Sequence, residues 1–281
     1  MFKTNRKGPL CLIAASVFWS LGGVLIKHVP WSGMSIIGIR AVLAAIVFGI
    51  YRKSAKIKFT TGNCLAAVCL SGTTIMYVFA NQLTTAAAAI MLQFTAPVFV
   101  LLLNFIFHRK KPKFSEILAV FFTLLGMLLF FGDELGEGQL LGNVLAICSG
   151  LSFAGVFVFN KRPDADPQHS IMLGFYLNSL IWLPFAFFDK AITPDPVTWS
   201  LIALMGLVQV GLAYVFFSVG IKTTPALLAC LITALEPVLN PLWVALTTTE
   251  RPGRYALAGG VVIIATIVIY NIWIERSSVK L

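Results

Sequence analysis

Two stretches of the 281-residue chain decide its fold. Residues 84–112 read TTAAAAIMLQFTAPVFVLLLNFIFHRKKP, and residues 224–252 read TPALLACLITALEPVLNPLWVALTTTERP. Each begins with small residues, carries a proline inside an apolar run and ends in a short polar turn with a further proline. About 20 apolar residues are needed to cross a bilayer as a helix, and both runs reach that length. The two stretches therefore predict membrane-spanning helices of a type that recurs within the chain.

The composition extends this interpretation to the whole chain. Hydrophobic residues make up 58% and charged residues only 11%, and the mean hydropathy is +0.90. A soluble domain has about a quarter charged residues. These values exclude a water-soluble enzyme, a disordered protein and a secreted disulfide scaffold. The five cysteines lie in or beside apolar runs without metal-ligand spacing, so we expect no disulfide, no metal site and no cofactor.

Ten apolar runs of spanning length follow one another along the chain. They lie at 8–27, 33–51, 62–80, 84–107, 115–131, 139–159, 170–188, 198–219, 224–248 and 255–274. They are long and continuous rather than alternating, which excludes membrane strands. The sequence thus predicts an all-α membrane protein with ten transmembrane helices.

Most of the Lys and Arg residues that give the chain its net charge of +10 lie in the predicted loops. If the N-terminus is cytoplasmic, 16 Lys and Arg residues fall in cytoplasmic segments and 4 in outer ones. Cytoplasmic loops of membrane proteins are enriched in Lys and Arg, so this bias supports ten helices with both termini inside and no nucleic-acid partner. We expect a multi-pass protein of the plasma (inner) membrane, of bacterial type.

An internal repeat divides the ten helices into two fives. At an offset of 140, Thr84 matches Thr224 and Pro97 matches Pro237. At an offset of 132, Ser20 and Ser152 match in the first helix of each half. Because five is odd, the second half enters the membrane from the opposite side, an arrangement typical of secondary transporters with a midplane site. The predicted repeats are 8–131 and 139–274.

The two stretches, taken as LTTAAAAIMLQFTAPVFVLLLNFIFHRKKP and KTTPALLACLITALEPVLNPLWVALTTTERP, and the opening FWSLGGVLIKH resemble the EamA family of the drug/metabolite transporter superfamily. The resemblance covers residues 8–274. It implies a ten-helix carrier for a small metabolite, often an amino acid or related amphiphile. The chain departs from the family pattern in one turn, where Lys110 stands in the first half at the place of Glu250 in the second.

Two ionisable residues lie well inside predicted spans, Arg40 and Glu236. Charged groups in lipid are costly, which makes both functional candidates. Glu236 is a candidate proton-coupling site or a counter-charge for a cationic or zwitterionic substrate. Arg40 is a candidate clamp for a carboxylate or phosphate. The alternatives are structural: Glu236 paired with Arg40 or with a kinked backbone, and Arg40 tying helices or snorkelling to the outer face.

Further candidates are aromatic or polar residues at mid-span. A ring that faces a cavity can hold an apolar or quaternary-ammonium group, and buried polar groups need partners. Proline inside a helix frees the carbonyl four residues before it, so Pro97 and Pro237 predict kinks in the fourth and ninth helices. The predicted substrate-binding residues are Trp19, Ser20, Arg40, Tyr77, Gln93, Ser152, Asn178, Tyr214 and Glu236.

Other motifs are assigned structural roles. Asp164-x-Asp166 resembles a metal-binding pair but lies in a short polar loop without further ligands, so we expect a solvated loop. A Walker sequence is absent, which excludes ATP hydrolysis of that type. Gly259 and Gly260 form a small-residue face that packs helices, within the chain or in a possible homodimer.

The sequence therefore predicts a secondary transporter that moves a small metabolite by alternating access, with proton coupling through Glu236 as an option. A broad-specificity drug-efflux carrier, a passive channel and an intramembrane lipid-modifying enzyme are the alternatives. The enzyme would need a cluster of carboxylates or a nucleophile with its base, and only one deep Glu is present in the predicted spans.

Overall fold

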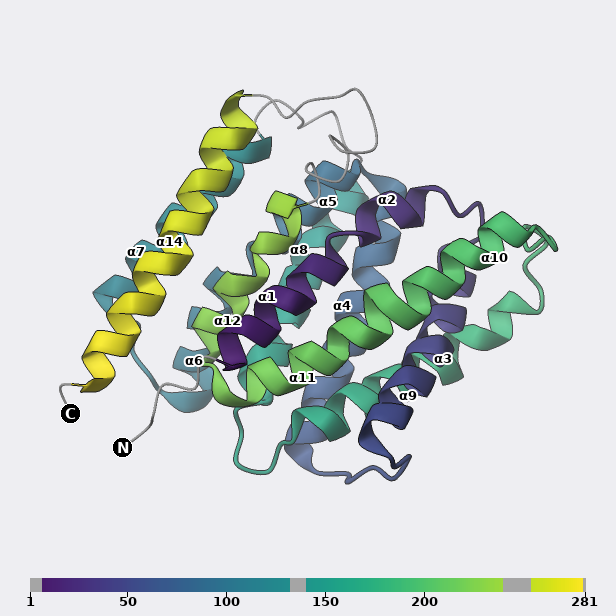
Figure 1. Cartoon of the computed structure of the whole chain (residues 1–281), viewed down its shortest axis with the longest axis horizontal. Coiled ribbons are helices and arrows are strands. Elements are labelled where there is room, and N and C mark those ends of the chain that lie inside the picture. The colour runs from purple at the N-terminus through teal and green to yellow at the C-terminus, as the bar shows by residue number, and fades with distance from the viewer. Residues whose placement is uncertain (1–6, 132–139, 240–253, 280–281) are drawn as a thin grey trace.

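The computed structural model describes residues 7–131, 140–239 and 254–279, all helices and connecting segments with no strand among them. The predicted turn with Glu250 and the junction between the two predicted repeats lie outside these residues. Labels follow Figure 1. The helices are α1 Lys7–Trp19, α2 Gly22–Lys27, α3 Gly33–Arg52, α4 Thr61–Leu83, α5 Ala86–Gln93, α6 Ala96–His108, α7 Phe114–Phe131, α8 Leu140–Phe159, α9 Pro167–Ala186, α10 Pro196–Ala203, the π-helix η1 Leu204–Leu212, α11 Ala213–Thr223, α12 Ala226–Thr233 and α14 Arg254–Val279.

Every predicted apolar run contains helix, and the all-α membrane fold is confirmed. Within the described part of the chain, six helices are long and apolar enough to cross a membrane. They are Gly33–Arg52, Thr61–Leu83, Ala88–His108, Leu140–Phe159, Pro196–Thr223 and Arg254–Arg276. The stretches Lys7–Trp19, Phe114–Phe130 and Ala226–Leu239 are shorter apolar helices. Helix α9 has 20 residues but includes polar ones such as Ser170 and Asn178, which are buried inside the bundle.

Four of the runs are not uniform α-helices; the ninth is interrupted at Ala234, between α12 and the helical residues 235–239. The first run breaks after Trp19 and resumes as α2 at Gly22, and the fourth breaks after Gln93 and resumes as α6 at Ala96. The eighth contains the nine-residue π-helix η1 between α10 and α11. In lipid, a backbone group released from its helix must find another partner or line a polar space. At the fourth run, the Thr95 hydroxyl donates to the carbonyl oxygen of Leu92 at 2.7 Å.

The helices pack mainly across the two halves of the chain. The most extensive contacts pair α4 with α8, α3 with α9, α7 with α14 and α1 with α11. In Figure 1, α7 and α14 form a pair at the left, and the start of α1 lies at the same end of the bundle as the end of α14. We call this the basic end, because Arg52, Arg109, Lys161, Lys222 and Arg276 lie at or just beyond the helix termini there.

Glycines allow close approach at two of these helix pairs. A Cβ atom on Gly38 of α3 would lie 2.5 Å from the backbone nitrogen of Leu183 in α9. A Cβ on Gly259 of α14 would lie 2.4 Å from the carbonyl oxygen of Gly126 in α7. Small residues allow membrane helices to approach closely. The small-residue face of α14 therefore packs within the chain, against α7.

An acidic residue beyond the end of α9 fastens α3 at the end of the bundle away from the basic end. The carboxylate of Asp189 accepts hydrogen bonds from the backbone nitrogen of Ser32 at 3.0 Å, from its hydroxyl at 2.7 Å and from the Ser35 hydroxyl at 2.6 Å. Burial alone would raise the pKa of Asp189, but the hydrogen bonds from Ser35, Ser32 and Ala191 lower it to about 2. The charged carboxylate thus caps α3 and joins the two helices.

Gly38→Ala should destabilise the protein, because its added methyl group meets the backbone of α9, which cannot move without separating the helices. Overpacking of this kind costs about 1–3 kcal/mol. Gly49→Ala on the same helix is the matched control, since its Cβ would meet only the end of the flexible Met172 side chain at 3.4 Å. Thermal unfolding in detergent should show a lower melting temperature for the first variant and an unchanged or slightly higher one for the second. Equal melting temperatures would contradict the packing of α3 on α9.

Asp189→Asn should lower the melting temperature at neutral pH and lose this effect in acid. A carboxylate whose folded pKa is depressed stabilises the fold above its ordinary pKa near 3.8, and that stability is lost as the pH falls toward 2. The difference in melting temperature between the wild type and the variant should be constant from pH 7 to 5 and shrink between pH 4 and 2.5. A difference that stays constant over the whole range would show that the charge of Asp189 is unimportant.

Candidate functional site

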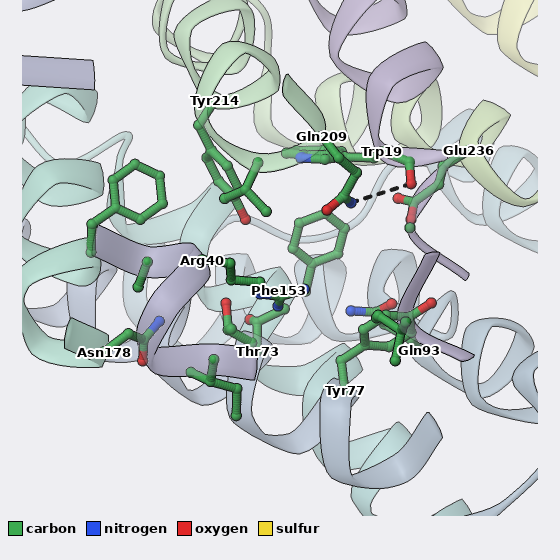
Figure 2. A pocket seen from close by; sticks show the side chains of 17 residues that line it. Trp19, Arg40, Thr73, Tyr77, Gln93, Phe153, Asn178, Gln209, Tyr214 and Glu236 are labelled. Atoms are coloured by element: carbon green, nitrogen blue, oxygen red, sulfur yellow. Dashed lines mark hydrogen bonds between the residues drawn. The ribbon is translucent and has the colours of Figure 1, made fainter. Parts of the chain in front are cut away.

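A polar cavity lies in the interior of the bundle. Its volume is about 70 Å³. Its lining comes from both halves of the chain: Trp19, Gly22, Ile26, Ile37, Arg40, Ala41, Thr73, Thr74, Tyr77, Gln93, Phe153, Phe175, Asn178, Gln209, Val210, Tyr214 and Glu236. Figure 2 shows these side chains converging.

Seven of the nine predicted substrate-binding residues line this cavity, namely Trp19, Arg40, Tyr77, Gln93, Asn178, Tyr214 and Glu236. The two serines lie elsewhere. Ser20 is buried at the break between α1 and α2, where its hydroxyl donates to the carbonyl oxygen of Val17. Ser152 packs against Gly72 of α4, whose Cβ would lie 3.0 Å from the serine hydroxyl.

Helix breaks position several of the lining residues. Trp19 is the last residue of α1 and Gln93 the last residue of α5. Glu236 follows the interruption at Ala234, where α12 ends and residues 235–239 continue as helix. Pro97 lies in the first turn of α6, and Pro237 lies directly after Glu236. The predicted kink positions therefore lie beside cavity residues in both halves.

Arg40 is buried in the middle of α3, with 7% of its surface exposed. Its guanidinium makes no side-chain hydrogen bond and no ion pair with any residue that the structure describes. In the view of Figure 2, it lies at the centre of the group, with Asn178 on one side and Glu236 on the other. A buried guanidinium without a partner is costly, so a ligand with an acceptor group would relieve it.

Glu236 is the acidic group of the cavity. Like Arg40, its side chain has no hydrogen bond or ion pair with another described residue. The sequence left open a pairing of Glu236 with Arg40, and no ion pair joins them in the structure. The cavity thus presents one cationic and one anionic group, neither of which pairs with a residue that the structure describes.

Neutral polar groups hold the remaining wall in place. The Gln93 amide donates to the Ser149 hydroxyl at 3.0 Å, and that hydroxyl donates to the carbonyl oxygen of Thr73 at 3.1 Å. The Ser71 hydroxyl donates to Asn178 Oδ1 at 2.5 Å. These bonds join α4 to α5, α8 and α9, so the amides are fixed before any ligand arrives. Such preorganisation lowers the cost of binding.

Aromatic side chains fill the bundle between the cavity and the basic end. The ring of Trp19 lies 5.0 Å from that of Tyr214 and 5.1 Å from that of Phe217, centre to centre. Phe157, two residues before the end of α8, packs on Phe217 at 5.6 Å and on Phe153 at 4.7 Å. These buried rings separate the cavity from the basic end.

Three further aromatic residues of the apolar runs, and the loop aspartate Asp164, have structural surroundings. Phe94 is fully buried in the main core, and Trp182 packs on Phe79 and Phe185. Tyr176 lies in an apolar groove between α3 and α9. Asp164 accepts hydrogen bonds from the backbone nitrogen of Gly62 and from Arg162, which gives this loop aspartate a structural role. Within the described ranges, no three His, Cys, Asp or Glu side chains gather as a metal site.

Sequence reasoning missed Gln209, Phe153 and Phe175. The two phenylalanines could not be told from core residues in their apolar runs. Gln209 could have been found, because it is the only polar side chain in the nine residues of η1, LMGLVQVGL. The rule that mid-span polar groups need partners applies to it as it does to Gln93.

Membrane transporters are among the proteins built as a many-helix bundle with a central polar cavity, and comparison with known proteins supports this class. The sequence matches the EamA-like transporter family over residues 6–132 and 140–272. An uncharacterized transporter of Archaeoglobus fulgidus is 27% identical over 95% of this chain and 97% of its own length. The uncharacterized transporter YxxF of Bacillus subtilis is 25% identical over 65% of this chain and 60% of its own length.

A solved crystal structure aligns with 95% of this chain and 98% of its own chain, with a TM-score of 0.80 at 16% identity, which shows a shared fold. The chain belongs to the EamA-like transporter family. It is therefore a multi-pass membrane protein of transporter type, and the family points to transport rather than to catalysis.

Arg40→Met should separate the role of the guanidinium in binding from any role in folding. Because the buried charge has no partner in the described protein, its removal should raise the free energy of unfolding, by about 1 kcal/mol or more. Arg52→Met on the same helix is the control, since Arg52 donates to the carbonyl oxygen of Lys56 and contacts His169 at 3.0 Å each. Melting temperatures should rise or hold for the first variant and fall for the second. A larger fall for Arg40→Met would make Arg40 a structural tie.

Proposed function

We propose that this protein is a secondary transporter whose cavity binds a small zwitterionic metabolite, an amino acid or a related amphiphile. The observation that carries the proposal is the pair of opposite charges, Arg40 and Glu236, that line one cavity without pairing with each other. Guanidinium binds carboxylates in a bidentate manner, and a carboxylate at the same cavity complements an ammonium group. The rings of Trp19, Tyr77 and Tyr214 offer apolar surface to the rest of the solute.

The size of the cavity favours a small metabolite over a broad range of drugs. Sites for drug-sized ligands measure about 300–1,000 Å³, whereas this cavity measures about 70 Å³. The fixed amides of Gln93 and Asn178 also favour a selective polar site. Efflux of bulky compounds would need a wider conformation than this one.

The helix contacts support alternating access by two inverted halves. If the five spans of each half correspond in order, exchanging the halves converts the pair α1–α11 into the pair α8–α4, and both pairs are extensive. The pairs α3–α9 and α7–α14 convert into themselves. This pattern is expected of a pseudo-two-fold axis between inverted repeats, with the substrate site at their interface.

The basic end is then the cytoplasmic end of a plasma-membrane protein, by the positive-inside rule. The aromatic rings that include Trp19, Phe157 and Phe217 pack between the cavity and this side. Transport would require them to separate. Glu236 is the group proposed to couple this movement to protons, because it is the acidic residue at the cavity.

A thermal-shift comparison of matched compounds tests the zwitterionic site. L-alanine should raise the melting temperature of the purified protein more than L-lactate, which lacks the ammonium group, or L-alaninamide, which lacks the carboxylate. A compound present at 100 times its dissociation constant stabilises the folded protein by about 2.7 kcal/mol. In Arg40→Gln, L-alanine should no longer raise the melting temperature more than L-alaninamide does. In Glu236→Gln, it should no longer raise it more than L-lactate does. A wild-type response to sugars or nucleosides, and to none of the amino acids, would refute the proposal.

Proton coupling is tested in proteoliposomes with an imposed pH gradient. Glu236→Gln should abolish the acceleration of amino-acid flux by the gradient, because the amide cannot take up and release a proton. Exchange of labelled for unlabelled amino acid at equal pH should persist, even if weakened. Gradient-driven flux equal to that of the wild type would exclude Glu236 as the coupling residue.

A further inference from the structure

The π-helix η1 carries Gln209, a cavity residue that is not among the substrate-binding residues predicted from the sequence. It interrupts the regular helix between α10 and α11, close to the middle of the run. A π-helical turn changes the register of the side chains that follow it, and π segments inside helices occur frequently at functional sites. Gln209 lies within this segment, is 7% exposed and lines the cavity.

The Gln209 amide uses one of its two ends within the protein. Its Nε2 atom donates to the carbonyl oxygen of Trp19 at 3.4 Å, the bond drawn as a dashed line in Figure 2. Trp19 is the residue where α1 ends, so its carbonyl lies at a helix break. This bond fixes the orientation of the amide and directs its oxygen away from Trp19.

The other end of the amide is buried without a partner. No donor among the described residues reaches Gln209 Oε1. A buried acceptor left unsatisfied costs about 1–3 kcal/mol, and here the acceptor belongs to a residue that lines the cavity. A donor group on a bound solute would recover that energy.

Gly22 provides the space that this arrangement needs. A Cβ atom at position 22 would lie 2.7 Å from Gln209 Nε2 and 3.3 Å from its amide carbon. Any other residue there would push the amide from its place. The break between α1 and α2 and the π-helix therefore fit together around a single side chain.

We propose that Gln209 Oε1 accepts a hydrogen bond from an N–H group of the transported solute and so selects ammonium groups that carry N–H donors over fully methylated ones. This inference rests on the proposed function, because it assigns a second group to the recognition of the ammonium end. Glu236 supplies the charge, which attracts methylated and unmethylated ammonium alike. The amide oxygen supplies direction, and a site built to hydrogen-bond a donor rejects an analogue that lacks it.

Chemical labelling first tests whether position 209 faces the cavity, without any assumption about the solute. Gln209→Cys, in a background with the five native cysteines replaced by Ala or Ser, should react with a small charged methanethiosulfonate reagent. Leu207→Cys is the control, because Leu207 lies in the same segment and is exposed on the outside of the bundle, toward lipid. A Gln209→Cys variant that reacts no faster than the control would overturn the inference.

Binding selectivity then tests the hydrogen bond. The wild type should bind L-alanine at least tenfold more tightly than N,N,N-trimethyl-L-alanine, and Gln209→Leu should reduce this ratio to near one. Gly22→Ala should reduce this ratio of affinities as well. The double variant Gly22→Ala, Gln209→Leu should have the same ratio as Gln209→Leu alone, because both changes act on the same amide. Glu236→Gln should lower the affinity for both compounds by a similar factor.

A structural role would give a different result. If Gln209 only ties η1 to α1, Gln209→Leu should lower the melting temperature and leave the L-alanine preference unchanged, which overturns the inference. If the wild type binds neither compound, the proposed function fails, and the labelling result alone then decides whether Gln209 faces the cavity. If the wild type binds both compounds equally tightly, the proposed zwitterionic site stands, but the proposed role of Gln209 in selectivity is wrong.

Discussion

The rule that lipid offers no hydrogen bonds to the backbone governs this structure. Regular helices satisfy it along most of their length, and their apolar side chains face the bilayer. Four helices break or change their regular α-helical geometry beside the cavity. Helix α1 ends at Trp19, α5 ends at Gln93, α12 stops shortly before Glu236, and η1 carries Gln209. The irregular backbone is found where polar groups can be used, and the same positions supply the cavity lining.

Glycine contacts and helix breaks complement each other in holding this cavity. Gly38 brings α3 onto α9, and α3 carries Arg40 while α9 carries Asn178. The hydrogen bonds of Gln93 and Ser149 fix α5 against α8 on another side. The result is a polar space with fixed walls, lined by Arg40 and Glu236, which form no ion pair with any residue that the structure describes. Charges kept unpaired in a low-dielectric interior destabilise the protein alone and stabilise it when a complementary ligand binds.

Much of this arrangement could be predicted from the sequence. The apolar runs and the loop charges predict the helices, and the cost of polar groups in lipid identifies Arg40, Glu236, Gln93 and Asn178 as cavity candidates. The rest depends on three-dimensional register. Ser20 and Ser152 share the sequence signal of the cavity residues, but one hydroxyl is used by its own helix and the other faces Gly72. The π-helix has no sequence signal in an apolar run, so the orientation of Gln209 could not be foreseen.

The central claim is that a zwitterionic solute occupies the space between Arg40 and Glu236. A crystal structure of the protein with Se-methyl-L-selenocysteine, collected at the selenium edge, tests it most directly. Because the protein itself contains sulfur but no selenium, the account predicts an anomalous peak in the cavity, with the solute carboxylate at Arg40 and its ammonium at Glu236 and Gln209. A peak in the apolar groove beside Tyr176, or an occupied cavity with the solute in the reverse orientation, would contradict it.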